Sequence, residues 1–448
     1  MSASSKPTPA EVESSYRVSP ALYVIGSLER GVTIYSQQVR AHNLVWALAE
    51  LHRGGVRKLG RVAIVGGGIA GLTTAACLLS LLAEDKEVSI DLFEQSWDLC
   101  PLQQGADVRW VHPHIYNWPR VGSRAPGASL PVLDWAEGRA SDVARTVMRE
   151  FGKFHAAFAK RHNSISIYLG LRHFRIDDKK QEISWIAHRT SRADEFFHLA
   201  QPEGTSAKFD TIILATGFGT ETPVSGFALE SYWRNEQLGQ PPLDGVQRRF
   251  LVSGFGDGAL VDLCRLTVER FRQDTILYEL FETDLEAVEA YYAAAIDQIG
   301  STANVFELFK QSEEAMLLRA KERLRNRLRK DTQVTLHLRG RKNEATTFPY
   351  IFGPYNSFLH RLLIYLLYRC GALALEFGDL ESAVIRRRVD VHSVLCRYGA
   401  KTIEHLASLF VNAETVTHRF EEMKEKQLQL PERLWLPGAF PHYSQAQV

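Results

Sequence analysis

The residues whose type and spacing best suit chemistry are three glycines, Gly66, Gly68 and Gly71, arranged as GxGxxG. The first permits a tight turn, the second lets the backbone approach a diphosphate, and the third lets the following helix pack closely on the preceding strand. Backbone amides at the helix start, those of Ile69 and Ala70, then face the phosphates and are favoured by the helix dipole. The spacing predicts a dinucleotide-binding turn.

Such a turn needs a strand before it, a helix after it and a second strand that ends in an acid. Residues 61–65 form a continuous apolar run, typical of a parallel strand covered on both faces. Residues 72–83 predict the helix and residues 88–93 the second strand. Glu94 ends that strand beside Gln95, where its carboxylate can accept from a ribose hydroxyl pair.

A second, weaker copy of this pattern begins near residue 250. Residues 250–253 predict a strand and residues 260–272 a helix, and the turn between them contains Gly254, Gly256 and Ala259. This copy predicts a nicotinamide nucleotide site.

Two acids bear on the choice of nucleotide. Asp257 lies within the second turn, where a carboxylate would cap the helix start and compete with a phosphate for the same amides. Residues 275–278 predict a strand that ends in Glu279, which would accept from a ribose diol and repel a 2′-phosphate. Glu279 favours NADH over NADPH, but nearby arginines could bind a 2′-phosphate, so both nucleotides stay possible. A second turn that binds no nucleotide is the third alternative.

Composition limits the class of protein. The chain has 448 residues, of which 45% are hydrophobic and 23% charged, and its net charge is +1. This mix is that of a soluble globular protein, and the charge balance supplies no overall field for nucleic acid or an anionic membrane. The five cysteines contain no CxxC pair. We therefore expect a cytoplasmic protein with no metal site and no dithiol centre.

In this order the motifs resemble those of the glutathione-reductase-like flavoproteins. The run 210–218 (DTIILATGF) looks like the second motif of that group, with Thr216 and Gly217 at its ATG turn. The resemblance implies bound FAD, NADH or NADPH as reductant, and activity close to that of flavin monooxygenases and N-hydroxylases. No CxxC follows the first turn, and the sequence has no clear late Gly-Asp motif.

The same resemblance gives the expected fold and domains. The fold is α/β, a doubly wound parallel sheet of Rossmann type with an antiparallel meander (strands near 165–171, 183–187 and 196–200), plus a second Rossmann-like domain. Residues 1–20 are expected to be a flexible tail. Residues 21–247 form the FAD-binding domain with an N-terminal helical extension. Residues 248–448 form the second nucleotide or substrate domain, with a helical insertion at 281–330.

The best candidates for substrate chemistry lie in the aromatic, proline-broken segment after Glu94. Arg109 can hold a carboxylate, His112 and His114 can move a proton near neutral pH, and Tyr116 can stack on a planar partner. Three hypotheses stay open. The chain is an FAD-dependent oxidoreductase that uses NAD(P)H on a small molecule, an amine or amino-acid oxidase with an unused second site, or a dinucleotide-binding sensor or scaffold. A homo-oligomer is compatible with each.

Overall fold

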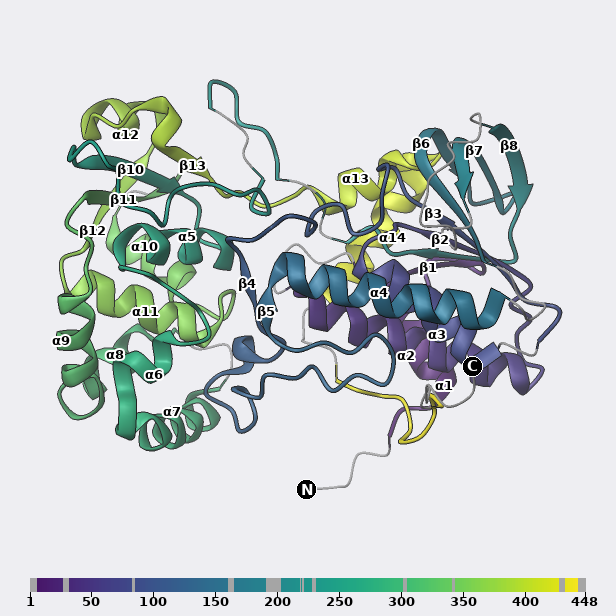
Figure 1. Ribbon diagram of the computed structural model, residues 1–448, viewed down its shortest axis with the longest axis horizontal. Helices are drawn as coiled ribbons and strands as arrows, with labels where there is room; N and C mark the ends of the chain where they lie inside the picture. Colours follow the sequence, from purple (N-terminus) through teal and green to yellow (C-terminus); the bar gives the residue numbers. More distant parts are fainter. Residues whose placement is uncertain are drawn as a thin grey trace.

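The computed structural model describes residues 6–26, 32–82, 85–159, 165–190, 203–217, 219, 221–227, 231–300, 304–340, 343–426 and 432–441. It confirms the α/β class. Two mainly parallel sheets, each covered by helices, form two units that lie side by side (Figure 1).

The first sheet has seven strands in the order β1-β9-β2-β3-β6-β7-β8. Their bounds are β1 Leu22–Val24, β2 Arg61–Val65, β3 Ser89–Phe93, β6 Ile165–Asp177, β7 Glu182–Thr190, β8 Glu203–Lys208 and β9 Thr211–Leu214. The strands from β1 to β6 are parallel, and β7 and β8 add the antiparallel meander. The third meander strand is β8; the expected strand at 196–200 lies outside the described residues.

Helices cover one face of this sheet, and the chain's C-terminal helices pack with the meander on the other. The first group is α1 Pro9–Tyr16, α2 Ile34–Arg53, α3 Ile69–Leu82 and α4 Ala140–Ala159; the second is α13 Thr402–Ser408 and α14 Ala413–Lys426 (Figure 1). Phe420 of α14 is fully buried beside the strands, and Phe440 packs in the core around α2. The expected second domain, 248–448, is therefore too long at its C-terminal end, because α13, α14 and the segment around Phe440 pack in the first unit.

The expectation of a flexible tail at 1–20 is also wrong for α1. Thr8 and Glu11 form a reciprocal capping box that satisfies the first amides of this helix. Val12 and Tyr16 are buried against the first unit, and the Tyr23 hydroxyl donates to Glu13 over 2.5 Å. Apolar burial on one face and a satisfied helix start explain why this short segment is ordered.

The second sheet is fully parallel, in the order β12-β11-β10-β13. Its bounds are β10 Arg248–Ser253, β11 Thr332–Arg339, β12 Leu373–Gly378 and β13 Val394–Cys396. Helices α5 Asp257–Thr267 and α11 Phe358–Arg369 share a core with one face of this sheet, whereas α12 Leu380–Arg387 packs on the other. The unit is doubly wound, as expected.

Between α5 and β11 lies a group of helices that contains the insertion expected at 281–330 and begins before it. They are α6 Ile276–Phe281, α7 Leu285–Ile299, α8 Phe306–Ser312, a π-helical turn Glu313–Leu317 and α9 Leu318–Asn326, with 3-10 turn Glu282–Asp284. The remaining elements are α10 Glu344–Ile351, the strand pair β4 Trp110–Val111 and β5 Gly138–Arg139, and the 3-10 turns Ile115–Asn117 and Val391–Ser393. The expected strand at 275–278 is wrong, because α6 occupies this segment.

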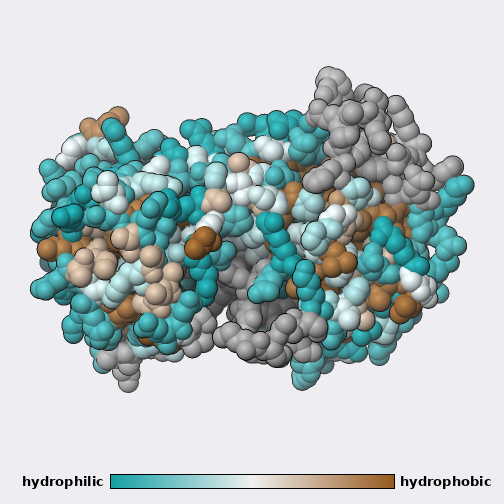
Figure 2. Space-filling view, turned by 90° about the horizontal axis from the view of Figure 1, so that it is seen from below, coloured by the Kyte–Doolittle hydropathy of each residue, from teal (hydrophilic) through white to brown (hydrophobic). Residues whose placement is uncertain are grey.

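Within the described ranges, no helix is long and apolar enough to cross a membrane. Figure 2 shows one face of the molecule, on which hydrophobic residues (brown) are scattered among hydrophilic ones (teal) over both units.

Candidate functional site

The two glycine turns have the same geometry. Gly66 follows β2 with φ +115°, and Gly254 follows β10 with φ +137°, values that favour glycine. Gly66 N donates to Phe93 O on β3 over 2.8 Å, and Gly254 N donates to His337 O on β11 over 3.2 Å. Each turn is thus held to the neighbouring strand by the same bond, so the second turn repeats the first.

A second contact also repeats. A Cβ on Gly66 would lie 2.5 Å from Ala215 O, just after β9, and a Cβ on Gly254 would lie 2.3 Å from Arg397 O, just after β13. Both neighbouring segments then turn at a glycine with positive φ, Gly217 at +67° and Gly399 at +75°. Ala215 and Thr216 of the ATG run therefore contact the first turn closely, and Arg397 contacts the second turn in the same way.

The first turn has the shape of a ligand cradle. A Cβ on Gly68 would meet no protein atom within 4 Å, whereas one on Gly71 would lie 1.8 Å from Gly66 O. The space beside Gly68 is thus open, while Gly71 is fixed by the packing of α3 on β2. Because α3 begins at Ile69, the amides of Ile69 and Ala70 are in its first turn and have no intrahelical acceptor.

Glu94 supports this cradle from the end of β3. Its two carboxylate oxygens accept the N–H groups of Gly67 and Ser96, each over 2.7 Å. Each oxygen keeps a lone pair for a further donor, such as a ribose hydroxyl. Gln95, which follows, is exposed. The residues of the first turn therefore fit a dinucleotide.

Asp257 does not compete for the second turn. Its carboxylate accepts from His360 Nδ1 over 2.6 Å and from Ser357 N over 3.0 Å, both at the start of α11. The expectation that Asp257 caps its own helix is wrong, because the cap residue of α5 is Gly256, with no side-chain hydrogen bond. A Cβ on Gly256 would likewise meet nothing within 4 Å.

Glu279 is not a ribose-binding acid. It lies in α6, where its carboxylate accepts from the Thr275 hydroxyl over 2.6 Å and pairs with Arg327. The strand that follows α5 in the sheet is β11, more than fifty residues further on. Glu279 therefore gives no reason to expect NADH rather than NADPH at the second turn.

A cavity of about 330 Å³ lies between the two units. Its wall combines the start of α2, the aromatic segment around β4, the second glycine turn (254–259) and residues 397–399. Four residues between the two sheets complete it, namely Gly219, Glu221, Tyr232 and Trp233. This volume is within the usual range of small-molecule sites. Much of the wall is aromatic, through Tyr35, Trp110, Trp135, Tyr232, Trp233 and Phe255. Such a lining suits a flat, largely apolar ligand.

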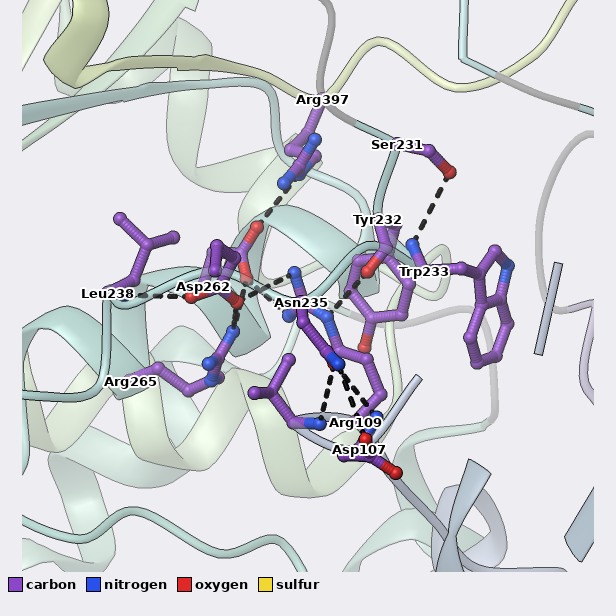
Figure 3. Close-up of polar contacts among 12 residues, drawn as sticks. Asp107, Arg109, Ser231, Tyr232, Trp233, Asn235, Leu238, Asp262, Arg265 and Arg397 are labelled. Atoms are coloured by element: carbon purple, nitrogen blue, oxygen red, sulfur yellow. Dashed lines mark hydrogen bonds and ion pairs between the residues drawn. The ribbon is translucent and has the colours of Figure 1, made fainter. Parts of the chain in front are cut away.

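Three arginines near this cavity converge on one buried carboxylate, Asp262 of α5 (Figure 3). Arg109 Nη1 lies 2.5 Å from Asp262 Oδ1, and Arg397 Nε donates to Asp262 Oδ2 over 2.8 Å. Arg265 approaches the same carboxylate at 3.5 Å and pairs with Glu236. Burial alone would raise the pKa of Asp262, but the arginines, Arg109 foremost, outweigh it and lower that pKa.

The Arg109 side chain is held by contacts within the protein, with Asp262 and Tyr232. Its guanidinium carbon lies 3.9 Å from the ring centroid of Tyr232, and its Nε donates to Tyr232 O over 2.6 Å. Although Arg109 lines the cavity, its charge is matched by Asp262, so we do not retain it as a carboxylate anchor for substrate.

The two histidines also have structural duties. His112 Nδ1 accepts the N–H groups of His114 and Ile115, each over 3.1 Å, which leaves the proton of the neutral ring on Nε2. Burial lowers the pKa of His112 to about 4 and lowers that of His114 as well. His114 Nε2 lies 3.0 Å from Gly127 O. His112 therefore lines the cavity as a neutral ring, which does not suit the expected proton transfer near neutral pH; for His114 that role stays a prediction.

Tyr116 is the member of the expected set that still suits a role in the cavity. Its ring lies edge-on to that of His360 at 5.7 Å, and burial raises its pKa, so the phenol stays protonated. Two residues on, Trp118 is buried in the core of the second unit, and its Nε1 donates to Glu289 over 2.8 Å. The aromatic segment is thus an arm of the first unit that docks on the second.

Sequence reasoning missed several wall residues. The start of α2 lies at the cavity, after β1, which adds a fifth parallel strand beside β9. Thr33 caps this helix, because its hydroxyl accepts the N–H of Ser36 over 2.9 Å. The apolar run 22–24 was the available signal. Tyr232 and Trp233 gave no signal, since they are brought in from a distant segment.

No model of a known protein family matches the chain, and no curated protein matches its sequence. Among solved structures it is similar to a NAD-dependent persulfide reductase from A. fulgidus (12% identity, TM-score 0.30, 76% of this chain and 45% of that chain). It is also similar to the covalent putidaredoxin reductase–putidaredoxin complex (14%, 0.25, 72% and 50%).

A third similar structure is the FAD-bound cadaverine monooxygenase of desferrioxamine biosynthesis from Erwinia amylovora (11%, 0.31, 86% of this chain and 99% of that chain). The chain spans half or less of the length of the first two proteins. Matches at this identity and TM-score assign no activity, so the function proposed next rests on the chain's own geometry.

Proposed function

We propose that the protein is an FAD-dependent oxidoreductase that takes reducing equivalents from a nicotinamide nucleotide and acts on a small molecule in the cavity. One observation supports this most strongly. Two strand–turn–helix units share the same register and the same glycine contacts, and the cavity lies between the units that contain them. A single glycine turn is a common packing device; two matched turns in adjoining units, the second of which lines the aromatic cavity, suit two cofactors that must react together.

The first turn is the proposed FAD site. The amides of Ile69 and Ala70 would hold the diphosphate, with the open space beside Gly68 for its approach. Glu94 would accept from the ribose. The carboxylate of Glu94 is already held in place by the N–H groups of Gly67 and Ser96, so binding of the ribose requires little rearrangement.

The second turn is the proposed nicotinamide nucleotide site. The carboxylate of Asp257 binds to the start of α11, so it does not occupy the amides at the start of α5. The open space beside Gly256 leaves room for a phosphate. Bound flavin would supply the redox chemistry by accepting a hydride and passing electrons onward. The chain's own residues would shape the cavity, exclude water with aromatic side chains and offer the protonated phenol of Tyr116 as a hydrogen-bond donor.

Within this class we propose oxygenation of the small molecule rather than disulfide reduction. The run 210–218 resembles the motif of flavin N-hydroxylases and monooxygenases, and the chain has no CxxC dithiol. No disulfide joins any of the five cysteines, all of which the structure describes.

The flavin assignment is tested with the purified protein. We expect a yellow solution with absorbance near ~450 nm that releases FAD on denaturation. Gly68→Val should lower FAD content by about tenfold or more, since its side chain would enter the space left for the diphosphate. The backbone of Gly68 is outside the left-handed region, so the variant should keep the wild-type fold by circular dichroism.

Gly152→Ala is the matched control. A Cβ there also meets nothing within 4 Å, but Gly152 lies in α4, away from the turn. This variant should keep its FAD. Full FAD occupancy in Gly68→Val would contradict the placement. Anaerobic bleaching of the flavin by NADH or NADPH would support the proposed reductant, whereas bleaching by amines alone would favour the oxidase hypothesis.

A further inference from the structure

The repeat of the two turns allows the ribose position of the second to be located by register. In the first unit Val65 pairs with Phe93, and the next residue on that strand is Glu94. In the second unit Ser253 pairs with His337, and the next residue is Leu338. The place of the ribose-binding carboxylate is therefore taken by an aliphatic side chain, which is 1% exposed within the core.

The residue after Leu338 is a cation. Arg339 ends β11 and is exposed at the carboxyl edge of the sheet, where the nucleotide turn lies. Its guanidinium carbon is 5.9 Å from the ring centroid of Tyr398, and Tyr398 lines the cavity together with the second glycine turn. Arg339 is thus beside the place where the adenosine ribose of a nucleotide on this turn would lie.

The nearest acids on the neighbouring strand are engaged elsewhere. Glu376 of β12 pairs with Arg386 at 2.7 Å and with Arg387 at 2.6 Å. Asp379 caps α12 by accepting from Ser382 N over 2.9 Å. Among the residues that the structure describes, none forms an ion pair with Arg339, so its charge is available to an anion.

We propose that Arg339 makes the second turn selective for a 2′-phosphorylated adenine nucleotide, so that the reductant is NADPH rather than NADH. The inference rests on the proposed function. Leu338 offers no acceptor to a ribose 2′-hydroxyl, so NADH gains no hydrogen bond at that position. A 2′-phosphate brings two negative charges and three acceptor oxygens, which the Arg339 guanidinium meets with charge-assisted hydrogen bonds.

The test measures binding rather than turnover. The flavin-containing protein is titrated by calorimetry with adenosine 2′,5′-bisphosphate and with 5′-AMP, which differ only in the 2′-phosphate. We expect the bisphosphate to bind about 10- to 100-fold more tightly, the range of a charge-assisted hydrogen bond. Arg339→Ala should remove this ratio without changing 5′-AMP affinity or flavin content, and Arg339→Lys should keep part of it.

Arg249→Ala is the matched control, because Arg249 is an exposed arginine at the opposite, amino-terminal end of the same sheet. It should keep the full ratio. Equal binding of the two nucleotides by the wild-type protein, or a ratio retained in Arg339→Ala, overturns the inference but leaves the proposed function intact. Binding of neither nucleotide to a protein that holds FAD overturns both the inference and the proposed nicotinamide site.

Discussion

At the scale of single residues, one buried carboxylate organises three arginines. Arg109 comes from the arm of the first unit, Arg265 from α5, and Arg397 from the segment after β13. Asp262 therefore contacts residues that lie up to 153 positions away from it in the sequence, on both sides. Because the arm forms one wall of the cavity, this cluster holds that wall against α5 and the segment after β13.

We expect Asp262→Asn to lower the free energy of unfolding by about 3–5 kcal/mol, since the buried arginines would lose the carboxylate that they share. Glu236 remains as a partner of Arg109 and Arg265. Urea denaturation measures the change. Asp244→Asn is the control: Asp244 pairs with Arg248 at the surface, where both side chains are nearly half exposed, so its loss should leave stability almost unchanged. Similar losses in the two variants would show that the buried cluster is not stabilising.

At the scale of elements, the C-terminal helices complete the first unit rather than the second. Ile403 and Leu406 of α13 and Phe420 of α14 pack with Phe209, Trp185 and other residues of the first sheet. Val411 N also donates to Ile176 O over 3.0 Å, next to the isolated bridge between Ile176 and Phe410. The chain therefore leaves the first unit after β9, builds the second, and returns.

Phe420→Ala should reduce stability by about 3–5 kcal/mol through lost burial and a residual cavity. Hydrogen exchange should report the site of the damage. We expect faster exchange in β6 and β7 of the first unit, with β10 and β11 of the second unit changed less. Val411→Ala, at a side chain that is 59% exposed, should change stability by less than about 0.5 kcal/mol. Faster exchange confined to β10 and β11 would contradict the placement of α14.

At the scale of the whole molecule, acid sensitivity follows from histidines that fold in their neutral form. Burial lowers the pKa of five described histidines, and those of His42 and His112 fall to about 4; the others are His114, His155 and His337. In the unfolded chain each has a pKa near ~6.5. Between these values the unfolded state binds more protons, so stability is full above pH ~6.5 and falls as the pH drops towards ~4.

His42 gives the sharpest test, because it is fully buried in α2 against Trp435 and Phe440. Between pH 7.5 and pH 5.0 this one group should account for about 2 kcal/mol of lost stability. We therefore expect His42→Phe, which keeps an aromatic ring, to lose about 2 kcal/mol less than the wild-type protein over the same range. Equal losses in the two proteins would show that His42 is not the titrating group.

Much of the fold was predictable from the sequence because the relevant signals are local. Glycine spacing, continuous apolar runs and the residues at their ends gave β2, α3, β3 and β10 within a few residues. Errors arose where local pattern and tertiary context disagree. The run 275–278 is apolar like a strand, but β12 and β13 form the two edges of the second sheet. The segment instead forms α6, whose apolar side chains pack in the core of the second unit.

The candidate site divides in the same way. By itself the sequence determined the two turns, Glu94 and the α/β class, because a glycine turn and its flanking strands are specified by neighbouring residues. Only the tertiary structure decided that Arg109 serves Asp262, that His112 is a neutral ring, and that Leu338 with Arg339 replaces the second acid. Those outcomes depend on contacts between residues far apart in the chain, where burial and charge pairing, rather than local propensity, set the energy.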